Sequence, residues 1–197
     1  MPGIVVTATS DEQVSTAQLK THLRVLHDDD DTYIGLLGTA AREYIEEYTH
    51  QAMVPKAITW FLEDFPAGSQ ILHLKDHNPL QSVSEITYLD TDGTEVTMST
   101  EDFNIDTDSR IGKVLTGQST SWPGDVYDYP GNNNVEIDLG VGHTTASCPE
   151  SFRHAEKLLV KHWYMERSPV SVGHIARDIP LTVNALLDPH VINRFGP

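Results

Sequence analysis

The spacing of apolar residues changes along the chain, and the first stretch has the period of a helix. Leu19, Leu23 and Leu26 recur every three or four residues, as on a helix with one buried face. This period predicts two helices, over about residues 15–26 and 31–49. Ser15 and Gln18 have the spacing of a capping box, which indicates where the first helix begins.

From Val54 onward the period falls to two, which is typical of strands with one buried face. Gly93 supplies the positive φ of a hairpin turn between two of these strands. Loops rich in Gly, Pro and Asn separate the later strands. The predicted strands cover residues 58–62, 85–89, 95–98, 103–105, 111–115 and 135–139.

The helical period returns at Pro149, which suits a first helical turn, and predicts a long helix that ends near residues 167–169. A short closing helix begins at Pro180. Its motif residues are Pro180, Val183, Leu186, Leu187 and Pro189. The tail over residues 190–197 has no partner within the chain that the sequence identifies.

These elements predict an α+β fold, in which a small helical bundle module is interrupted by a β-rich insert. Residues 1–53 form the N-terminal arm and helix pair of the module, and residues 54–147 form the insert. Residues 148–197 complete the module with the long helix, the short helix and an extended tail. The helix pair packs on the long helix, because short helices are only marginally stable alone.

The amino-acid composition limits the classes of protein to which the chain can belong. With 39% hydrophobic and 21% charged residues, the chain resembles an ordinary globular protein. It contains no apolar run near the roughly 20 residues of a membrane span, and its start lacks the pattern of a signal peptide. Cys148, the single cysteine, excludes an internal disulfide. It is either a small buried residue, which is the favoured interpretation, or a reactive thiol.

The formal net charge of −16 is the strongest feature of the composition. Thirteen Lys and Arg residues among 29 Asp and Glu residues argue against broad binding of nucleic acid. The charge indicates a well-solvated surface. A second hypothesis is a surface that lies close to DNA without holding it.

Ten histidines and the acidic run over residues 28–31 suggest a metal site, but their spacing argues against one. His154 and His162 are eight residues apart on one helix, and His73 and His77 straddle a turn. The acidic run suits the start of a helix, where carboxylates stabilise free N–H groups. No calcium loop, phosphate loop or nucleophile elbow of the required spacing occurs. The sequence therefore predicts no enzyme, no metal and no cofactor.

Several blocks together carry a family resemblance: residues 19–25, 28–31, 44–49, 80–93, 121–123, 135–142, 149–167 and 180–189. Their order and spacing are similar to those of the head–tail connector (adaptor) proteins of long-tailed bacteriophages and gene transfer agents. One position departs from the pattern, since His190 stands where family members often carry an aromatic residue followed by Arg. The basic residue comes later here, at Arg194.

The resemblance implies a structural virion protein of the neck, present in the host cytoplasm during assembly. It would form a ring, most simply a dodecamer, beneath the portal. The ring would extend the DNA channel, let double-stranded DNA pass without tight binding, and offer a platform to a stopper or tail-terminator protein. Two alternatives remain: another neck or tail-completion protein, and a metal-dependent hydrolase.

The resemblance also implies that the tail binds the portal, and its mixture of apolar residues with one cation suits an interface. The residues expected to bind are His190, Val191, Ile192, Asn193, Arg194 and Phe195. Deleting residues 190–197 is then expected to abolish portal docking while leaving the melting temperature nearly unchanged.

Overall fold

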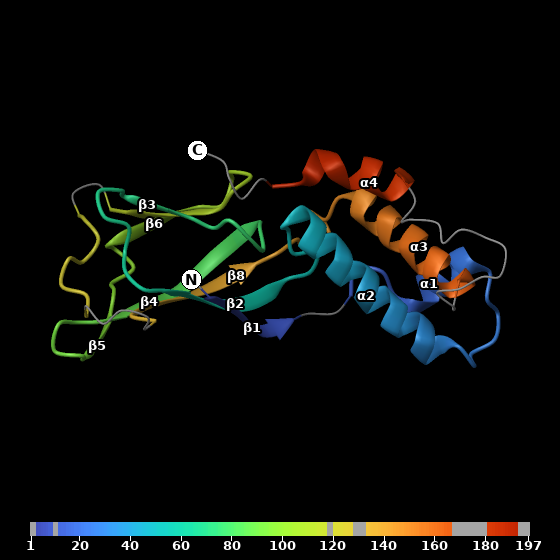
Figure 1. Ribbon diagram of the computed structural model, residues 1–197, viewed down its shortest axis with the longest axis horizontal. Coiled ribbons are helices and arrows are strands. Elements are labelled where there is room, and N and C mark those ends of the chain that lie inside the picture. The colour runs from blue at the N-terminus through green and yellow to red at the C-terminus, as the bar shows by residue number, and fades with distance from the viewer. Residues whose placement is uncertain (1–2, 10–11, 118–119, 128–132, 167–180, 193–197) are drawn as a thin grey trace. The chain divides into compact units, whose positions relative to one another are not determined.

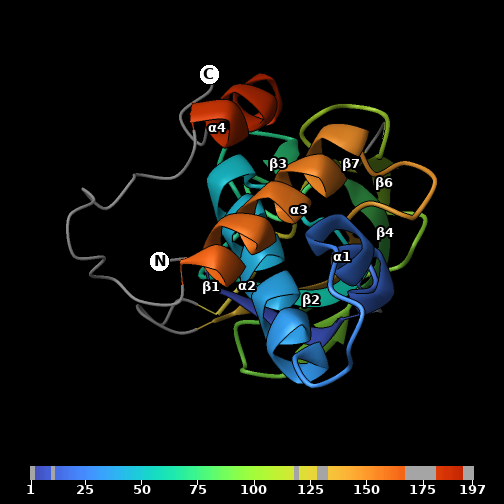
Figure 2. The same ribbon diagram turned by 90° about the vertical axis from the view of Figure 1, so that its right-hand side faces the viewer.

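The computed structural model describes residues 3–9, 12–117, 120–127, 133–166 and 181–192. Figure 1 shows its helices and strands, and Figure 2 shows them turned by 90°. In chain order the elements are β1 (Gly3–Thr9), α1 (Thr16–Leu23), α2 (Asp31–Thr49), β2 (Lys56–Leu62), β3 (Ile71–His73), β4 (Leu80–Leu89), β5 (Glu95–Thr97), β6 (Phe103–Asp106), β7 (Lys113–Thr116), β8 (Val135–Val141), α3 (Glu150–Met165), α4 (Leu181–Leu187) and a 3₁₀ turn (Asp188–His190). The predicted α+β class is confirmed.

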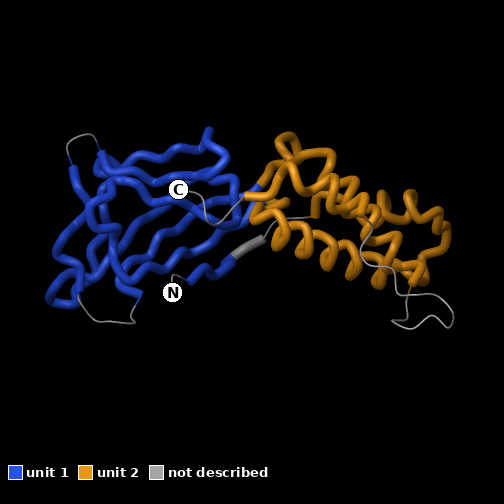
Figure 3. Tube along the Cα trace, turned by 45° about the horizontal axis from the view of Figure 1, so that its top comes forward, with its two compact units in different colours: residues 1–10, 55–142, 194–197 blue, residues 11–54, 143–193 orange. Residues whose placement is uncertain are grey.

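The described residues fall into two compact units, which are coloured separately in Figure 3. Unit 1 holds the strands and takes in the described parts of residues 1–10 and 55–142. Unit 2 holds the helices and takes in those of residues 11–54 and 143–193. No helix in the described part of the chain is long and apolar enough to cross a membrane.

Unit 1 contains two antiparallel sheets. The larger has the strand order β1-β2-β8-β4-β5, and the smaller has the order β3-β7-β6. Along β8 the buried and exposed side chains alternate, with Val135, Ile137 and Leu139 buried and Glu136 and Asp138 exposed. The two-residue period that predicted this strand therefore reflects one buried face of the sheet.

The predicted hairpin is confirmed as β4 and β5, which pair from Thr87 with Thr97 to Leu89 with Glu95. Gly93 has a φ of +77° in the turn, which a residue without Cβ adopts at little cost. The carboxylate of Asp90 accepts hydrogen bonds from two backbone N–H groups of the same turn. The acidic residues of this segment thus stabilise a turn.

The structure differs from the predicted division at the N-terminus. β1 pairs with β2 in unit 1, with Ile4 opposite Trp60 and Val6 opposite Ile58. The helical module therefore does not include the start of the chain. The sequence gives no alternating pattern here, because three apolar residues follow one another from Ile4, and the pairing partner lies some 50 residues away. Residues 143–147 differ as well, since they belong to unit 2.

Unit 2 is a helical bundle in which α1 and α3 both pack against α2, and α4 packs against α3 (Figure 2). α2 has the predicted bounds, and the capping box of Ser15 and Gln18 is confirmed at the start of α1. α1 ends earlier than predicted, where Arg24 adopts a left-handed conformation. The buried apolar core comprises Val14, Leu19, Ile34, Ala41, Ile45, Met53, Val54, Cys148, Phe152, Ala155, Leu159, Val160, Val183 and Leu187.

The structure corrects the expected roles of residues at two helix starts. Asp30 is the N-cap of α2, but its side chain makes no capping hydrogen bond and instead accepts one from the Tyr164 hydroxyl at 2.5 Å. Asp28 and Asp31 form ion pairs with Lys20 on α1. The acidic run therefore contributes ion pairs and a contact to α3. Pro149 is the N-cap of α3 and stands just before its first turn.

Candidate functional site

The closing motif lies in the core of unit 2. Val183 and Leu187 on α4 are fully buried, and Leu186 packs partly buried against the same core. Pro189 lies at the start of the 3₁₀ turn that follows. Pro180 lies outside the described residues. The motif therefore attaches the C-terminal segment of the chain to the bundle.

His190, the first residue assigned to the tail, is held by contacts from α3 and from the segment that follows α2. Its ring meets the Phe152 ring edge-on, with centroids 5.1 Å apart. Its Nε2 lies 3.0 Å from the hydroxyl oxygen of Ser151. Its backbone carbonyl accepts a hydrogen bond of 2.5 Å from the side-chain amide of Gln51.

Ile192 anchors the segment further along. Its side chain is 2% exposed, and its backbone N–H donates to the carbonyl oxygen of Thr49 at 3.0 Å. Val191, between the two anchors, is half-buried. The expectation that the tail has no partner within the chain is thus wrong for residues 190–192. Asn193, Arg194 and Phe195 lie outside the described residues.

A second histidine joins this anchor. The Nε2 of His143 lies 2.9 Å from the Oε1 atom of Gln51, and its ring is edge-on to Phe152. Burial lowers the pKa of His143, and the neighbouring His190 lowers it further, so its ring is neutral at pH 7. Gln51 therefore connects the loop before α3 to the C-terminal segment.

Deleting residues 190–197 is expected to destabilise unit 2 by about 3 kcal/mol, because it removes a buried isoleucine and two backbone hydrogen bonds. Deleting only residues 193–197 leaves these contacts in place and is expected to leave the melting temperature nearly unchanged. Thermal unfolding followed by circular dichroism measures both. Equal melting temperatures for the two truncations would show that residues 190–192 add no stability.

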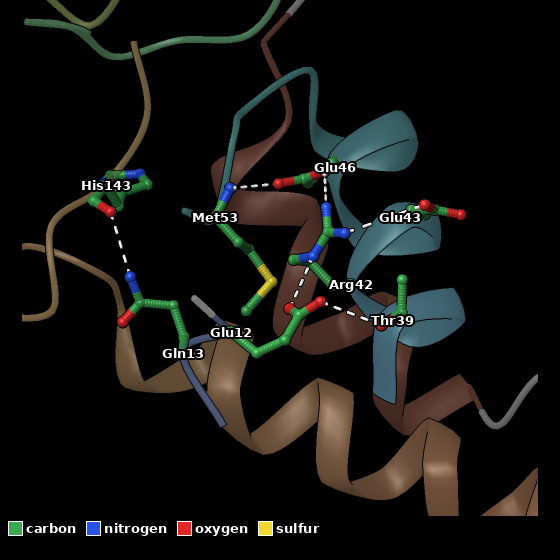
Figure 4. A network of polar contacts seen from close by, with 8 residues as sticks. All are labelled: Glu12, Gln13, Thr39, Arg42, Glu43, Glu46, Met53 and His143. Atoms are coloured by element: carbon green, nitrogen blue, oxygen red, sulfur yellow. Dashed lines mark hydrogen bonds and ion pairs between the residues drawn. The ribbon is translucent and has the colours of Figure 1, made fainter. Parts of the chain in front are cut away.

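A buried polar network, which the sequence analysis missed, joins α2 to the residues before α1 (Figure 4). Arg42 donates from Nε to Glu12 and from Nη1 to Glu46, both at 2.7 Å. The second oxygen of Glu46 accepts the backbone N–H of Met53 at 2.8 Å, and Thr39 donates to Glu12 at 3.0 Å. The network therefore fixes the start of α1 and the chain after α2 to one helix.

The Arg42 side chain is only 7% exposed, and that of Glu46 is 8% exposed. Burial alone would lower the pKa of Arg42, but the adjacent carboxylates of Glu46 and Glu12 outweigh it and raise the pKa. The guanidinium is therefore charged, and the carboxylates of Glu46 and Glu12 together compensate for the burial of this charge.

Glu156 on α3 lies close to this network and is 1% exposed. Neither of its carboxyl oxygens has a hydrogen-bond partner among the described residues. Burial raises its pKa to about 8, and the charge of Glu12 adds to the shift, while Arg42 and Lys157 oppose it. The side chain is therefore predominantly protonated at neutral pH.

The described residues offer little that could support catalysis. They include no group of three His, Cys, Asp or Glu side chains that could hold a metal ion. Cys148 is buried, and burial raises the pKa of its thiol to about 11, so the thiolate needed for nucleophilic attack is scarce at neutral pH.

Comparison with known proteins gives one family match and several structural matches. A family model described as "Phage gp6-like head-tail connector protein" matches residues 14–90. The resemblance to head–tail connectors is confirmed. The matched connector region includes α1, α2 and the strands up to the β4–β5 turn. No curated protein sequence matches the chain significantly.

Solved structures share the fold over nearly the whole chain. A chain of the structure described as "Neck of empty GTA particle computed with C6 symmetry" has a TM-score of 0.77 and 21% identity, covering 100% of this chain and 97% of that one. A chain of "Virion of native gene transfer agent (GTA) particle" has a TM-score of 0.77 and 19% identity. A chain of "Neck of native GTA particle computed with C12 symmetry" has a TM-score of 0.67 and 19% identity. Each of the last two covers 98% of this chain and 97% of the other.

Proposed function

We propose that the chain is a structural connector of the virion neck, a head–tail adaptor of a tailed phage or a gene transfer agent. The observation that carries this proposal is the shared fold over at least 98% of this chain and 97% of three chains from such particles. The connector family match over residues 14–90 supports it independently of the structural likeness. The adaptor joins the portal vertex of the capsid to the stopper or the tail-terminator protein.

We further propose that the adaptor acts as a homo-oligomeric ring, most simply a dodecamer. Support comes from the neck structures with a similar chain, which were computed with C6 and C12 symmetry. Such a ring extends the DNA channel of the portal. The net charge of −16 suits this role, because a conduit for DNA must not retain the phosphate backbone.

The portal contact is assigned to the end of the chain. Residues 190–192 are anchored on unit 2, so they fix the point from which the tail continues. Arg194 and Phe195 have the chemistry of interface anchors, one charged and one aromatic. Removing residues 193–197 is therefore expected to prevent co-purification with the portal without changing the melting temperature. Co-purification at the native level would show that the tail is not the anchor.

Removal of the whole gene tests the proposed function. Particles made without this protein are expected to be filled heads that lack tails, and a copy of the gene supplied in trans is expected to restore tails. Electron microscopy of negatively stained particles counts both forms. Normal numbers of tailed particles in the absence of the protein would contradict a connector function.

A further inference from the structure

The outer face of α3 carries a basic stripe, defined by His154, Lys157, Lys161 and Met165. These residues follow one another at intervals of three, four and four, which aligns them on one side of a helix. His154 and Lys161 are exposed, Lys157 is partly exposed, and Met165 is 73% exposed. The stripe faces away from the core, to which α3 contributes Phe152 and Leu159 among others.

The basic stripe carries two lysines whose charges have no carboxylate partner among the described residues. In the part of the chain that the structure describes, neither Lys157 nor Lys161 forms an ion pair. Burial lowers the pKa of His22 on the adjacent α1, and Lys161, His154 and Lys157 lower it further. In a chain of net charge −16 with only 13 Lys and Arg residues, Lys157 and Lys161 therefore lie together on this one face.

The outer face of α2 carries a matching acidic stripe, defined by Leu36, Ala40, Glu43 and Glu47. All four are exposed, Leu36 to 65%, and their intervals of four, three and four align them on one side of the helix. The Glu43 side chain is 66% exposed and makes one long contact of 3.9 Å with Arg42. This stripe also faces away from the shared core.

The two stripes are complementary when the helices run antiparallel. Each spans the same number of residues, about 16 Å at the rise of an α-helix. An antiparallel alignment brings His154 to Glu47 and Lys157 to Glu43. It brings Lys161 to Ala40, between the two carboxylates and Leu36, and Met165 to Leu36 at the far end. A parallel alignment would instead place Leu36 beside His154 and Met165 beside Glu47, so that each exposed apolar side chain would meet a polar one.

Cyclic symmetry produces this antiparallel relation. Within one copy α3 runs antiparallel to α2, since Tyr164 near the end of α3 bonds Asp30 at the start of α2. A modest rotation about a ring axis changes helix directions little, so α3 of one copy meets α2 of the next in the same sense. Two different faces that meet in this way form a heterologous contact, the kind that closes into a ring.

We propose that the basic stripe of one copy docks on the acidic stripe of the next copy and forms the contact between neighbours in the ring. This inference rests on the proposed function. Exposed ion pairs are individually weak and are screened by salt. The contact is therefore expected to hold when the portal gathers many copies at high local concentration, and to leave the isolated protein monomeric.

Disulfide cross-linking in assembled particles tests the contact. The double variant Glu43→Cys with Lys157→Cys is expected to give a ladder of linked copies after oxidation, and each single variant is expected to give none. The native thiol of Cys148 is buried and does not interfere. The matched control is Asp29→Cys with Lys157→Cys, because Asp29 is also acidic and its side chain is 94% exposed, but it lies outside the stripe.

Charge reversal provides the second measurement. Lys157→Glu with Lys161→Glu, and separately Glu43→Lys with Glu47→Lys, are each expected to reduce incorporation into necks by roughly tenfold. The four changes combined are expected to restore it. All four sites lie on the outer faces of their helices. Each variant is therefore expected to have the melting temperature of the native protein, which would show that its fold is intact.

The outcomes separate this inference from the proposed function. The stripe contact alone would be overturned if necks contain the double-cysteine protein but oxidation gives no ladder of linked copies. It would also be overturned if the charge reversals do not reduce incorporation into necks. Absence of the native protein from necks would overturn the connector function itself. If reversal of the basic stripe reduces DNA binding while rings assemble normally, the stripe is a phosphate-binding surface and the proposed contact is wrong.

Discussion

Replacing Arg42 with methionine is expected to lower the free energy of unfolding by about 3–5 kcal/mol, the cost of breaking a buried ion pair by removing one partner. The change leaves the Glu46 carboxylate, whose side chain is 8% exposed, without its counter-charge. It also frees Glu12 from the helix that positions it before α1. Urea unfolding followed by the helical circular dichroism signal measures the effect.

Lys161→Met serves as the matched control for Arg42→Met. It removes a cation from an exposed position that has no ion pair among the described residues, so it is expected to change stability by less than about 0.5 kcal/mol. The double variant Arg42→Met with Glu46→Gln is expected to recover part of the loss, because it also removes the buried charge. Equal stabilities of Arg42→Met and Lys161→Met would show that the buried network is not required.

Raising the pH from about 5 to about 9 is expected to destabilise unit 2 through Glu156. The pKa of Glu156 is about 8 in the folded chain, against a reference value of 4.5. The folded state therefore keeps the proton where the unfolded state loses it. The resulting stabilisation is complete below about pH 4.5 and is lost as the pH rises through about 8, with a full extent of roughly 5 kcal/mol.

Glu156→Gln isolates this effect, because glutamine has nearly the same shape and cannot ionise. The variant is expected to show a smaller loss of stability than the native protein between pH 5 and 9 in urea unfolding. The control is Glu150→Gln on the same helix, whose native side chain is 84% exposed and makes an ion pair with Arg153. Parallel stability–pH curves for the native protein and Glu156→Gln would contradict the assignment.

The features that the sequence predicts well are those that nearby residues determine. The amphipathic period predicts α2 with the bounds found in the structure, because a 19-residue helix repeats its pattern over several turns. The hairpin of β4 and β5 follows from a turn of Asp and Gly between two alternating segments. The capping box of α1 is similarly local.

The features that the sequence misses depend on residues far apart in the chain. β1 is defined as a strand by its pairing with β2, which lies about 50 residues later in the chain. The burial of Ile192 depends on the fold as well, since its N–H donates to Thr49. Apolar residues in a short terminal segment indicate that it is buried, but they do not indicate whether its partner is the same chain or another protein. The Arg42 network also joins residues from separate segments, since Glu12 lies 30 residues before Arg42 in the sequence.

The candidate site was predicted only in part for the same reason. The closing motif was identified from its spacing, and its burial in unit 2 explains why Val183 and Leu187 are apolar. The contacts of His190 with Phe152, Ser151 and Gln51 join residues far apart in the chain, so the sequence alone does not predict them. As a consequence, the tail divides into an internal anchor over residues 190–192 and the residues beyond it, for which the contact with the portal remains a proposal.

Cryo-electron microscopy of the neck, in particles that contain this protein, is the most direct test of the proposed connector function. We expect a ring of copies directly beneath the portal, each fitted by the two units, with the DNA channel continuing through the centre of the ring. A neck map in which this chain is absent from the ring beneath the portal, in particles known to contain the protein, would contradict it.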